Sequence, residues 1–236
     1  RGLGADYTSL LAVREKRGII VAIDGPAGSG KSSVARLVAE RLGIAKLNTG
    51  AAYRAVALLA LREGVDLGDG PALGGLAGRV ALEPSGVLVD GRRVPEEELR
   101  APEVSAAASR VSAHPEVREV LLPVQREAAE RARRAGGAGV EGRDIGTVVL
   151  PGADLKILLS ASPEERARRR ALQTGREQEV ERIRRAILER DRQDSERAVS
   201  PLRPAPDAAV IDTTGMGLEE VVEKVVGLVR ATDGEV

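Results

Sequence analysis

The feature that most constrains the fold is a glycine-rich segment, residues 25–32, that follows a strand-like run and precedes a helix-like one. The run before it, residues 18–24, is continuous, apolar and rich in β-branched residues, as is typical of a strand buried on both faces of a parallel sheet. Apolar residues then recur at helical spacing, at Val34, Leu37, Val38 and Leu42. The sequence therefore predicts a strand, a tight loop and a helix in direct succession.

Strand-like and helix-like runs alternate along most of the chain. Further strands are predicted at 45–47, 138–141, 155–159 and 208–212. Helices are predicted at about 30–42, 50–64, 116–135, 163–175, 177–194 and 217–231. This alternation predicts an α/β fold of three layers, in which a five-stranded parallel sheet is flanked by helices. Ligands of such sheets bind at the carboxyl ends of the strands.

Residues 66–115 break this alternation. They contain many Gly and Pro residues and two short strand candidates, 80–83 and 87–89. The second leads into Asp90-Gly91, a dipeptide typical of a hairpin turn, and Arg93-Val94 follows. We therefore expect a small insertion with antiparallel strands between a helix and the next strand of the parallel sheet.

One predicted helix contains a proline. Pro123 lies within the range 116–135, where it has no backbone N–H to donate and its ring crowds the preceding turn. We expect it to kink or divide that helix.

The composition argues against several kinds of protein. Basic and acidic side chains balance at thirty-six each, so the chain lacks the excess positive charge of a protein that follows a nucleic-acid backbone. Tyr7 and Tyr53 are the only aromatic residues, too few for a base-stacking platform. The absence of Cys excludes disulfides and thiolate metal sites, and it fits a cytoplasmic protein. No apolar run is long enough to span a membrane, and residues 1–17 are expected to be a poorly ordered leader rather than a signal peptide.

The glycine-rich segment also predicts chemistry, because it matches the phosphate-binding pattern G-x-x-x-x-G-K-[ST]. Lys31 would bring a mobile positive charge to a transferring phosphoryl group, and Ser32 would offer a hydroxyl to the Mg²⁺ that accompanies ATP. Asp24 either supports the metal through water or ends the strand without a role. The alternative is a glycine-rich turn with a surface lysine. The residues expected around the triphosphate are Gly25, Pro26, Ala27, Gly28, Ser29, Gly30, Lys31, Ser32 and Ser33.

Further groups of residues follow in a fixed order. Residues 48–54 read NTGAAYR after the second strand, and residues 141–147 read EGRDIGT after the third. Residues 107–109, Val117-Arg118 and several stretches within 190–214 complete the set. Together with the glycine-rich loop, this set resembles bacterial cytidylate kinase, a family of P-loop nucleoside monophosphate kinases, over roughly residues 18–230. The resemblance implies a CORE domain of residues 18–65 and 116–236, a monophosphate-binding insertion of residues 66–115, and a LID at about 166–190.

The resemblance also implies roles for individual residues. The phosphate of CMP or dCMP would be held by Thr49, Arg54, Arg143 and Arg197. Arg190 and Asp194 would contact the ribose, and the cytosine would be recognised by Ser109, Arg118 and Asp144. Arg166 and Arg170 would close over the triphosphate. The residues expected to take part in the transfer itself are Lys31, Arg143, Arg166, Arg170 and Arg197.

Each of these assignments has a simpler alternative. Arg190 and Asp194 are four residues apart and could be a solvated helix pair, and Ser109 could be plain helix surface. The chain has Asn48 where the family usually has Asp, so a role that needs a charge there is in doubt. The resemblance favours a monomeric ATP-dependent kinase of pyrimidine nucleotide metabolism. The rival hypotheses are a P-loop kinase for another small acceptor and an ATP-binding module without turnover.

Overall fold

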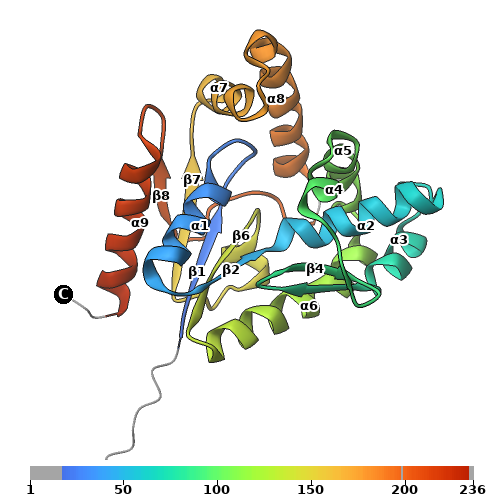
Figure 1. Ribbon diagram of the computed structural model, residues 1–236, viewed down its shortest axis with the longest axis horizontal. Helices are drawn as coiled ribbons and strands as arrows, with labels where there is room; N and C mark the ends of the chain where they lie inside the picture. Colours follow the sequence, from blue (N-terminus) through green and yellow to red (C-terminus); the bar gives the residue numbers. More distant parts are fainter. Residues whose placement is uncertain (1–17, 198, 234–236) are drawn as a thin grey trace, which may run out of the picture.

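A five-stranded parallel sheet forms the centre of the molecule, and helices cover both of its faces (Figure 1). The computed structural model describes residues 18–197 and 199–233, so the predicted leader lies outside the described residues. The strands stand in the order β2-β6-β1-β7-β8. Their bounds are β1 Ile19–Asp24, β2 Ala45–Asn48, β6 Gly137–Gly142, β7 Leu155–Ser160 and β8 Ala209–Asp212. All five predicted strands are present, which confirms the predicted fold class.

The central strand β1 divides the hydrophobic core in two. Ile20 and Ala22 are buried on one face, together with side chains of α2 (Thr49–Glu63) and α6 (Pro115–Arg134). Val21 and Ile23 are buried on the other face, against α1 (Lys31–Leu42) and α9 (Leu218–Asp233). Successive side chains of a strand point to opposite faces, so the continuous apolar run of β1 packs against a helical layer on each side.

A small antiparallel sheet lies within residues 66–115, as predicted. Its strands are β3 (Val80–Glu83), β4 (Gly86–Val89) and β5 (Arg92–Arg93), paired in the order β3-β4-β5. Asp90 and Gly91 both have positive φ angles, of 50° and 75°, as a tight hairpin turn requires. Three helices of this segment were not predicted as separate elements: α3 (Gly70–Ala77), α4 (Glu96–Arg100) and α5 (Pro102–Val111).

Two helices stand beyond the carboxyl ends of the parallel strands (Figure 1). They are α7 (Pro163–Thr174) and α8 (Val180–Glu196), with the short 3₁₀ turn η2 (Glu177–Glu179) between them. They pack against each other, and α8 also contacts α5. Side chains of both helices line the cavity described below. None of the helices described in residues 18–197 and 199–233 is long and apolar enough to cross a membrane.

Pro123 does not divide its helix, which was one of the two outcomes expected of it. Helix α6 runs from Pro115 to Arg134 with Pro123 inside it. Pro123 and Glu119, one turn earlier, are both exposed. Water can therefore bind the carbonyl oxygen of Glu119 that the proline ring leaves without an N–H donor, and the buried face of α6 remains intact.

Because Pro123 contributes no buried contact, we expect Pro123→Ala to stabilise the protein. Alanine restores one backbone hydrogen bond and removes the ring, a change worth up to about 3 kcal/mol in a helix interior. Urea denaturation of the two proteins measures the difference in free energy of unfolding. A loss of stability in Pro123→Ala would show that the helix depends on the proline.

Candidate active site

A cavity of about 860 Å³ opens at the carboxyl ends of the strands. Its lining comes from the loop after β1, from the ends of β2 and β6, and from α5, α7 and α8. The carboxyl ends of parallel strands are the usual place for ligands in an open α/β sheet. Most of the predicted site residues line this one space: Ala27, Gly28, Ser29, Gly30, Lys31, Ser32, Ser33, Thr49, Arg54, Arg118, Arg143, Asp144, Arg170, Arg190, Asp194 and Arg197.

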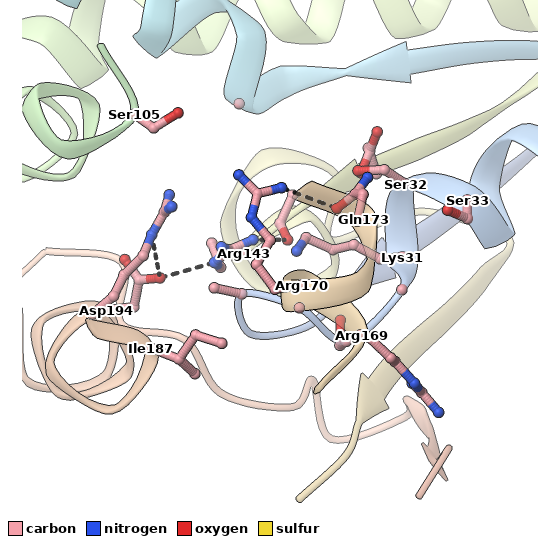
Figure 2. A pocket seen from close by; sticks show the side chains of 18 of the residues that line it. Lys31, Ser32, Ser33, Ser105, Arg143, Arg169, Arg170, Gln173, Ile187 and Asp194 are labelled. Carbon is pink, nitrogen blue, oxygen red and sulfur yellow. Dashed lines mark hydrogen bonds and ion pairs between the residues drawn. The ribbon is translucent and has the colours of Figure 1, made fainter. Parts of the chain in front are cut away.

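The glycine-rich loop curls as a phosphate-binding loop does. Gly28 and Gly30 have φ angles of 77° and 87°, a backbone region that side chains other than glycine rarely adopt. A Cβ on Gly28 would also lie 3.0 Å from the Cβ of Arg166. The loop ends at Lys31, whose ammonium group points toward Arg143 and Arg170 (Figure 2). The same group donates to the Pro26 carbonyl at 3.1 Å. Gly25 and Pro26 shape the loop from outside the lining.

Glu141 is a site residue that the sequence reasoning missed. Its side chain is 2% exposed, its Oε2 accepts a hydrogen bond from the Ser32 hydroxyl, and its Oε1 lies 3.3 Å from Lys46 Nζ. Oε1 has no hydrogen-bond partner among the described residues. A buried acidic residue at the end of a predicted strand was the available signal. The residues that surround Glu141 depend on which strands pair with β6, and the sequence alone does not show that pairing.

The acceptor side of the cavity is built on β2, β6 and α8. Thr49 Oγ1 donates to the Glu141 carbonyl at 2.8 Å, which joins the start of α2 to the end of β6. Arg143 Nε donates to Asp194 at 2.8 Å, and Asp194 is 5% exposed. Arg190 and Arg197 approach the same carboxylate at 4.0 and 3.9 Å. Asp194 is therefore a buried centre among three arginines, and the alternative of a solvated pair with Arg190 is wrong.

Arg118 and Asp144 form an ion pair in which both side chains are buried. The Arg118 guanidinium also donates to the Ser112 carbonyl at 3.2 Å and lies 5.5 Å from the centre of the Tyr53 ring. The ion pair and the contact with the Tyr53 ring hold the Arg118 guanidinium, a donor, beside the Asp144 carboxylate, an acceptor. Ser109 is not part of the lining; α5 contributes Pro102, Ser105 and Ala108, and Ser112 follows the helix. Figure 2 shows Ser105.

The structure places Arg166 beneath the phosphate-binding loop rather than in the cavity. Its guanidinium donates to the carbonyls of Ala27 and Ala161 at 3.0 and 2.9 Å and pairs with Asp191 at 2.6 Å. With 4% of its surface exposed, Arg166 joins the loop to α8. The prediction that Arg166 closes over the triphosphate was therefore wrong, and Arg166 supports the phosphate-binding loop from below.

Other arginines of α7 line the cavity instead. Arg168 and Arg169 belong to the lining, as does the predicted Arg170. Arg176, which follows α7, also lines the cavity. Arg169 donates to both the hydroxyl and the carbonyl of Thr213, at 2.9 and 2.6 Å. Arginines recur so often between 166 and 197 that their spacing alone could not show which of them face the site.

The structure also gives Asp24 a place that the sequence did not predict. Its two carboxylate oxygens accept the backbone N–H groups of Ile145 and Gly146, each at 2.8 Å. Asp24 is 5% exposed and does not line the cavity. The two hydrogen bonds give Asp24 a structural role, so the alternative of a strand end without a role is wrong.

The comparisons with known proteins agree with this arrangement. The model of the cytidylate kinase family matches residues 21–231. The chain belongs to the cytidylate kinase family. The cytidylate kinase of Desulfitobacterium hafniense is 47% identical over 221 residues, which cover 90% of this chain and 93% of that relative. The cytidylate kinase of Desulforamulus reducens is 50% identical over 214 residues, which cover 87% of this chain and 94% of that relative.

Among solved structures, an uncharacterized protein from Eubacterium ventriosum has a TM-score of 0.53. It is 11% identical, and the match covers 90% of this chain and 98% of that one. At this level of identity the likeness concerns the fold alone.

The cavity of this cytidylate kinase family member concentrates positive charge. Eleven basic and four acidic side chains line it, although the whole chain has a net charge of zero. Burial, and then the nearby charge of Arg143, lower the pKa of both Lys31 and Arg54. The same two causes lower the pKa of Arg190 to about 10. Bound phosphate would offset both the desolvation of these cations and their mutual repulsion.

Burial raises the pKa of Asp24 from 3.8 to about 6, so we expect Asp24→Asn to change how stability depends on pH. Between these values the folded protein keeps a proton that the unfolded chain has released, so the wild type loses stability as pH rises from about 4 to about 6. Relative to Asp24→Asn the loss is about 3 kcal/mol. Urea denaturation of both proteins from pH 4 to pH 7 measures it. Parallel pH curves would contradict the shifted pKa.

Proposed function

We propose that this protein transfers the γ-phosphoryl group of ATP to CMP or dCMP and releases ADP with CDP or dCDP. The observation that carries the proposal is that one cavity contains both the phosphate-binding loop around Lys31 and the buried pair Arg118–Asp144. Such a loop binds a nucleoside triphosphate, and a fixed donor–acceptor pair can distinguish one base from another. The curated names of the relatives, cytidylate kinase, support the same reaction.

The chemistry of Asp144 and Arg118 favours cytosine over uracil. A carboxylate accepts a hydrogen bond from the exocyclic amino group of cytosine, and a guanidinium donates to the ring nitrogen beside it. Uracil presents a carbonyl oxygen and an N–H at these positions, so both contacts would be mismatched. Leaving buried polar groups unpaired costs a few kcal/mol, which corresponds to a preference of roughly a hundredfold.

The arginines would hold the phosphates in line for transfer. Arg54, Arg143 and Arg197 line the cavity and would bind the acceptor phosphate, since guanidinium groups match phosphate oxygens with two parallel hydrogen bonds. Lys31 would follow the γ-phosphoryl group as its charge spreads over the equatorial oxygens. The acceptor oxygen is already ionised, so the reaction needs no strong general base. Positioning and charge neutralisation therefore account for the catalysis.

The residues at the end of the phosphate-binding loop fit Mg²⁺ bound together with ATP. Ser32 offers a hydroxyl, and Glu141 has a buried carboxylate oxygen that lies 3.3 Å from Lys46 Nζ and accepts no hydrogen bond within residues 18–197 and 199–233. Oxygen ligands of this kind suit Mg²⁺, which binds few protein groups and takes its other ligands from phosphates and water. The described residues contain no cluster of three acidic or histidine side chains that would hold a metal without nucleotide. When bound, Mg²⁺ would neutralise charge on the β- and γ-phosphates.

We further propose that residues 66–115 and about 166–190 act as mobile units over a CORE of residues 18–65 and 116–236. The cavity wall contains Arg100 and Ser105 from the first unit and Arg170 and Arg176 from the second. Closing these walls over bound nucleotides would exclude water that could otherwise hydrolyse ATP. We also propose that the protein acts as a monomer on free nucleotides in the cytoplasm.

An acceptor panel tests the proposed reaction. ADP formation from MgATP is measured with CMP, dCMP, UMP, AMP and shikimate offered separately. We expect strong turnover with CMP and dCMP, weak turnover with UMP and none with the others. Turnover with a different acceptor would reject the role of the Arg118–Asp144 pair, and ATP binding without turnover on any acceptor would reject the enzyme.

Asp144→Asn tests base recognition directly. The amide can still accept one hydrogen bond, but it carries an N–H group where uracil has a carbonyl oxygen. The ratio of kcat/KM for CMP to that for UMP should therefore fall by about tenfold or more. An unchanged ratio would remove Asp144 from base recognition.

Lys31→Ala tests the phosphate-binding loop. Loss of the charge that follows the transferring group should lower kcat with CMP by about a hundredfold or more. The folded state is checked by the unfolding midpoint in urea. Near-normal turnover in a folded variant would contradict the assignment of Lys31.

A further inference from the structure

Asp144 sits at a backbone position where its side chain would ordinarily have another partner. It precedes the π-helical turn η1 (Ile145–Val149) as the N-cap residue. An Asp at such a position usually accepts backbone N–H groups of the first helical turn. Here the Asp144 side chain makes no capping hydrogen bond and pairs with Arg118 instead.

A different carboxylate takes over this capping role. Asp24, at the end of β1, accepts the N–H of Ile145 with one oxygen and the N–H of Gly146 with the other. Asp24 and Asp144 are 120 positions apart, and they meet because β1 and β6 pair in parallel with Asp24 opposite Gly142. The two N–H groups are buried, so without Asp24 they would need another acceptor.

We propose that Asp24 is a positioning residue that keeps the Asp144 carboxylate free to recognise the acceptor base. This inference rests on the proposed function of Asp144. When Asp24 caps the turn, Asp144 faces Arg118 and the cavity. When Asp24 cannot cap both N–H groups, Asp144 is the nearest carboxylate in sequence and is drawn back toward its own turn. The base-recognition pair with Arg118 is then lost.

The charges around Asp24 are consistent with this role. Burial is the main cause that raises its pKa to about 6, and the charge of Asp144 adds to the effect. The two backbone N–H groups and Lys31 act in the opposite direction. Near pH 8 the carboxylate is therefore ionised, and both of its oxygens can accept. The position also precedes Gly25, so the residue that starts the phosphate-binding loop is adjacent to the one that orients base recognition.

Asp24→Asn provides the test, because asparagine keeps the shape but has only one acceptor oxygen. At pH 8 we expect the CMP-to-UMP ratio of kcat/KM to fall about tenfold or more, mainly through a higher KM for CMP. The affinity for an ATP analogue, measured by titration calorimetry without acceptor, should stay unchanged. A variant that only loosened the fold would bind both CMP and the ATP analogue more weakly.

Asp154→Asn is the matched control. Asp154 also accepts a backbone N–H of β1, from Ile20 at 2.7 Å, and pairs with Arg133. Asp154 lies beside the start of β1, whereas Asp24 is at its end, and Asp154 does not line the cavity. Its replacement should leave the CMP-to-UMP ratio unchanged. If Asp24→Asn does not fold, Asp24→Glu serves instead, since its longer side chain keeps the charge but shifts the cap, and the same fall in ratio is expected.

A double-mutant cycle with Asp144→Asn decides whether Asp24 acts through Asp144. In the Asp144→Asn background, adding Asp24→Asn should change the ratio little, because the residue that it positions is already altered. If Asp144→Asn narrows the ratio and neither Asp24 variant does, the positioning role is wrong and the proposed function stands. Additive effects of the two substitutions would also overturn the positioning role. An unchanged ratio in Asp144→Asn would reject base recognition by Asp144, and the role of Asp24 with it.

Discussion

The parallel pairing of β1 with β6 is the constraint on which the rest of the site depends. The two strands run in register, so that Asp24 stands opposite Gly142 and both strands end at the same level. The phosphate-binding loop leaves one strand at that level, and Arg143 and Asp144 leave the other. The part of the site assigned to ATP and the part assigned to the acceptor are therefore held together by backbone hydrogen bonds of the sheet.

Charge gives the cavity its second property. A chain without net charge gathers eleven basic side chains around one space and buries several of them. Burial lowers the pKa of Lys31 and of several arginines, which means that the free protein holds these cations at an energetic cost. Asp194 and Glu141 reduce that cost inside the protein. The remaining excess of positive charge suits polyphosphate ligands. Most of it lies in residues 66–115 and about 166–190, the two units that we propose to be mobile.

The sequence was informative where a residue's role depends on its local backbone, and less so where the role depends on distant neighbours. The strands, the glycine-rich loop and the Asp90-Gly91 turn are local patterns, and all three were predicted. Arg166, Asp24 and Glu141 take their roles from partners more than 20 residues away. Pro123 does not divide α6 for a related reason, since its effect depends on whether the carbonyl that it leaves without an N–H donor faces water or the core.

Asn48 shows how such distant neighbours can alter a familiar motif. It pairs with Glu141 at the ends of β2 and β6, so the Asp that the family usually carries there would put a second carboxylate beside a buried one. Like charges at that distance repel strongly where water is excluded. With Asn48, Glu141 is the only acid of these two opposed residues, and Lys46 and the Ser32 hydroxyl are its partners. The substitution therefore leaves a single carboxylate at this pair of strand ends, that of Glu141, with Lys46 as its counter-ion.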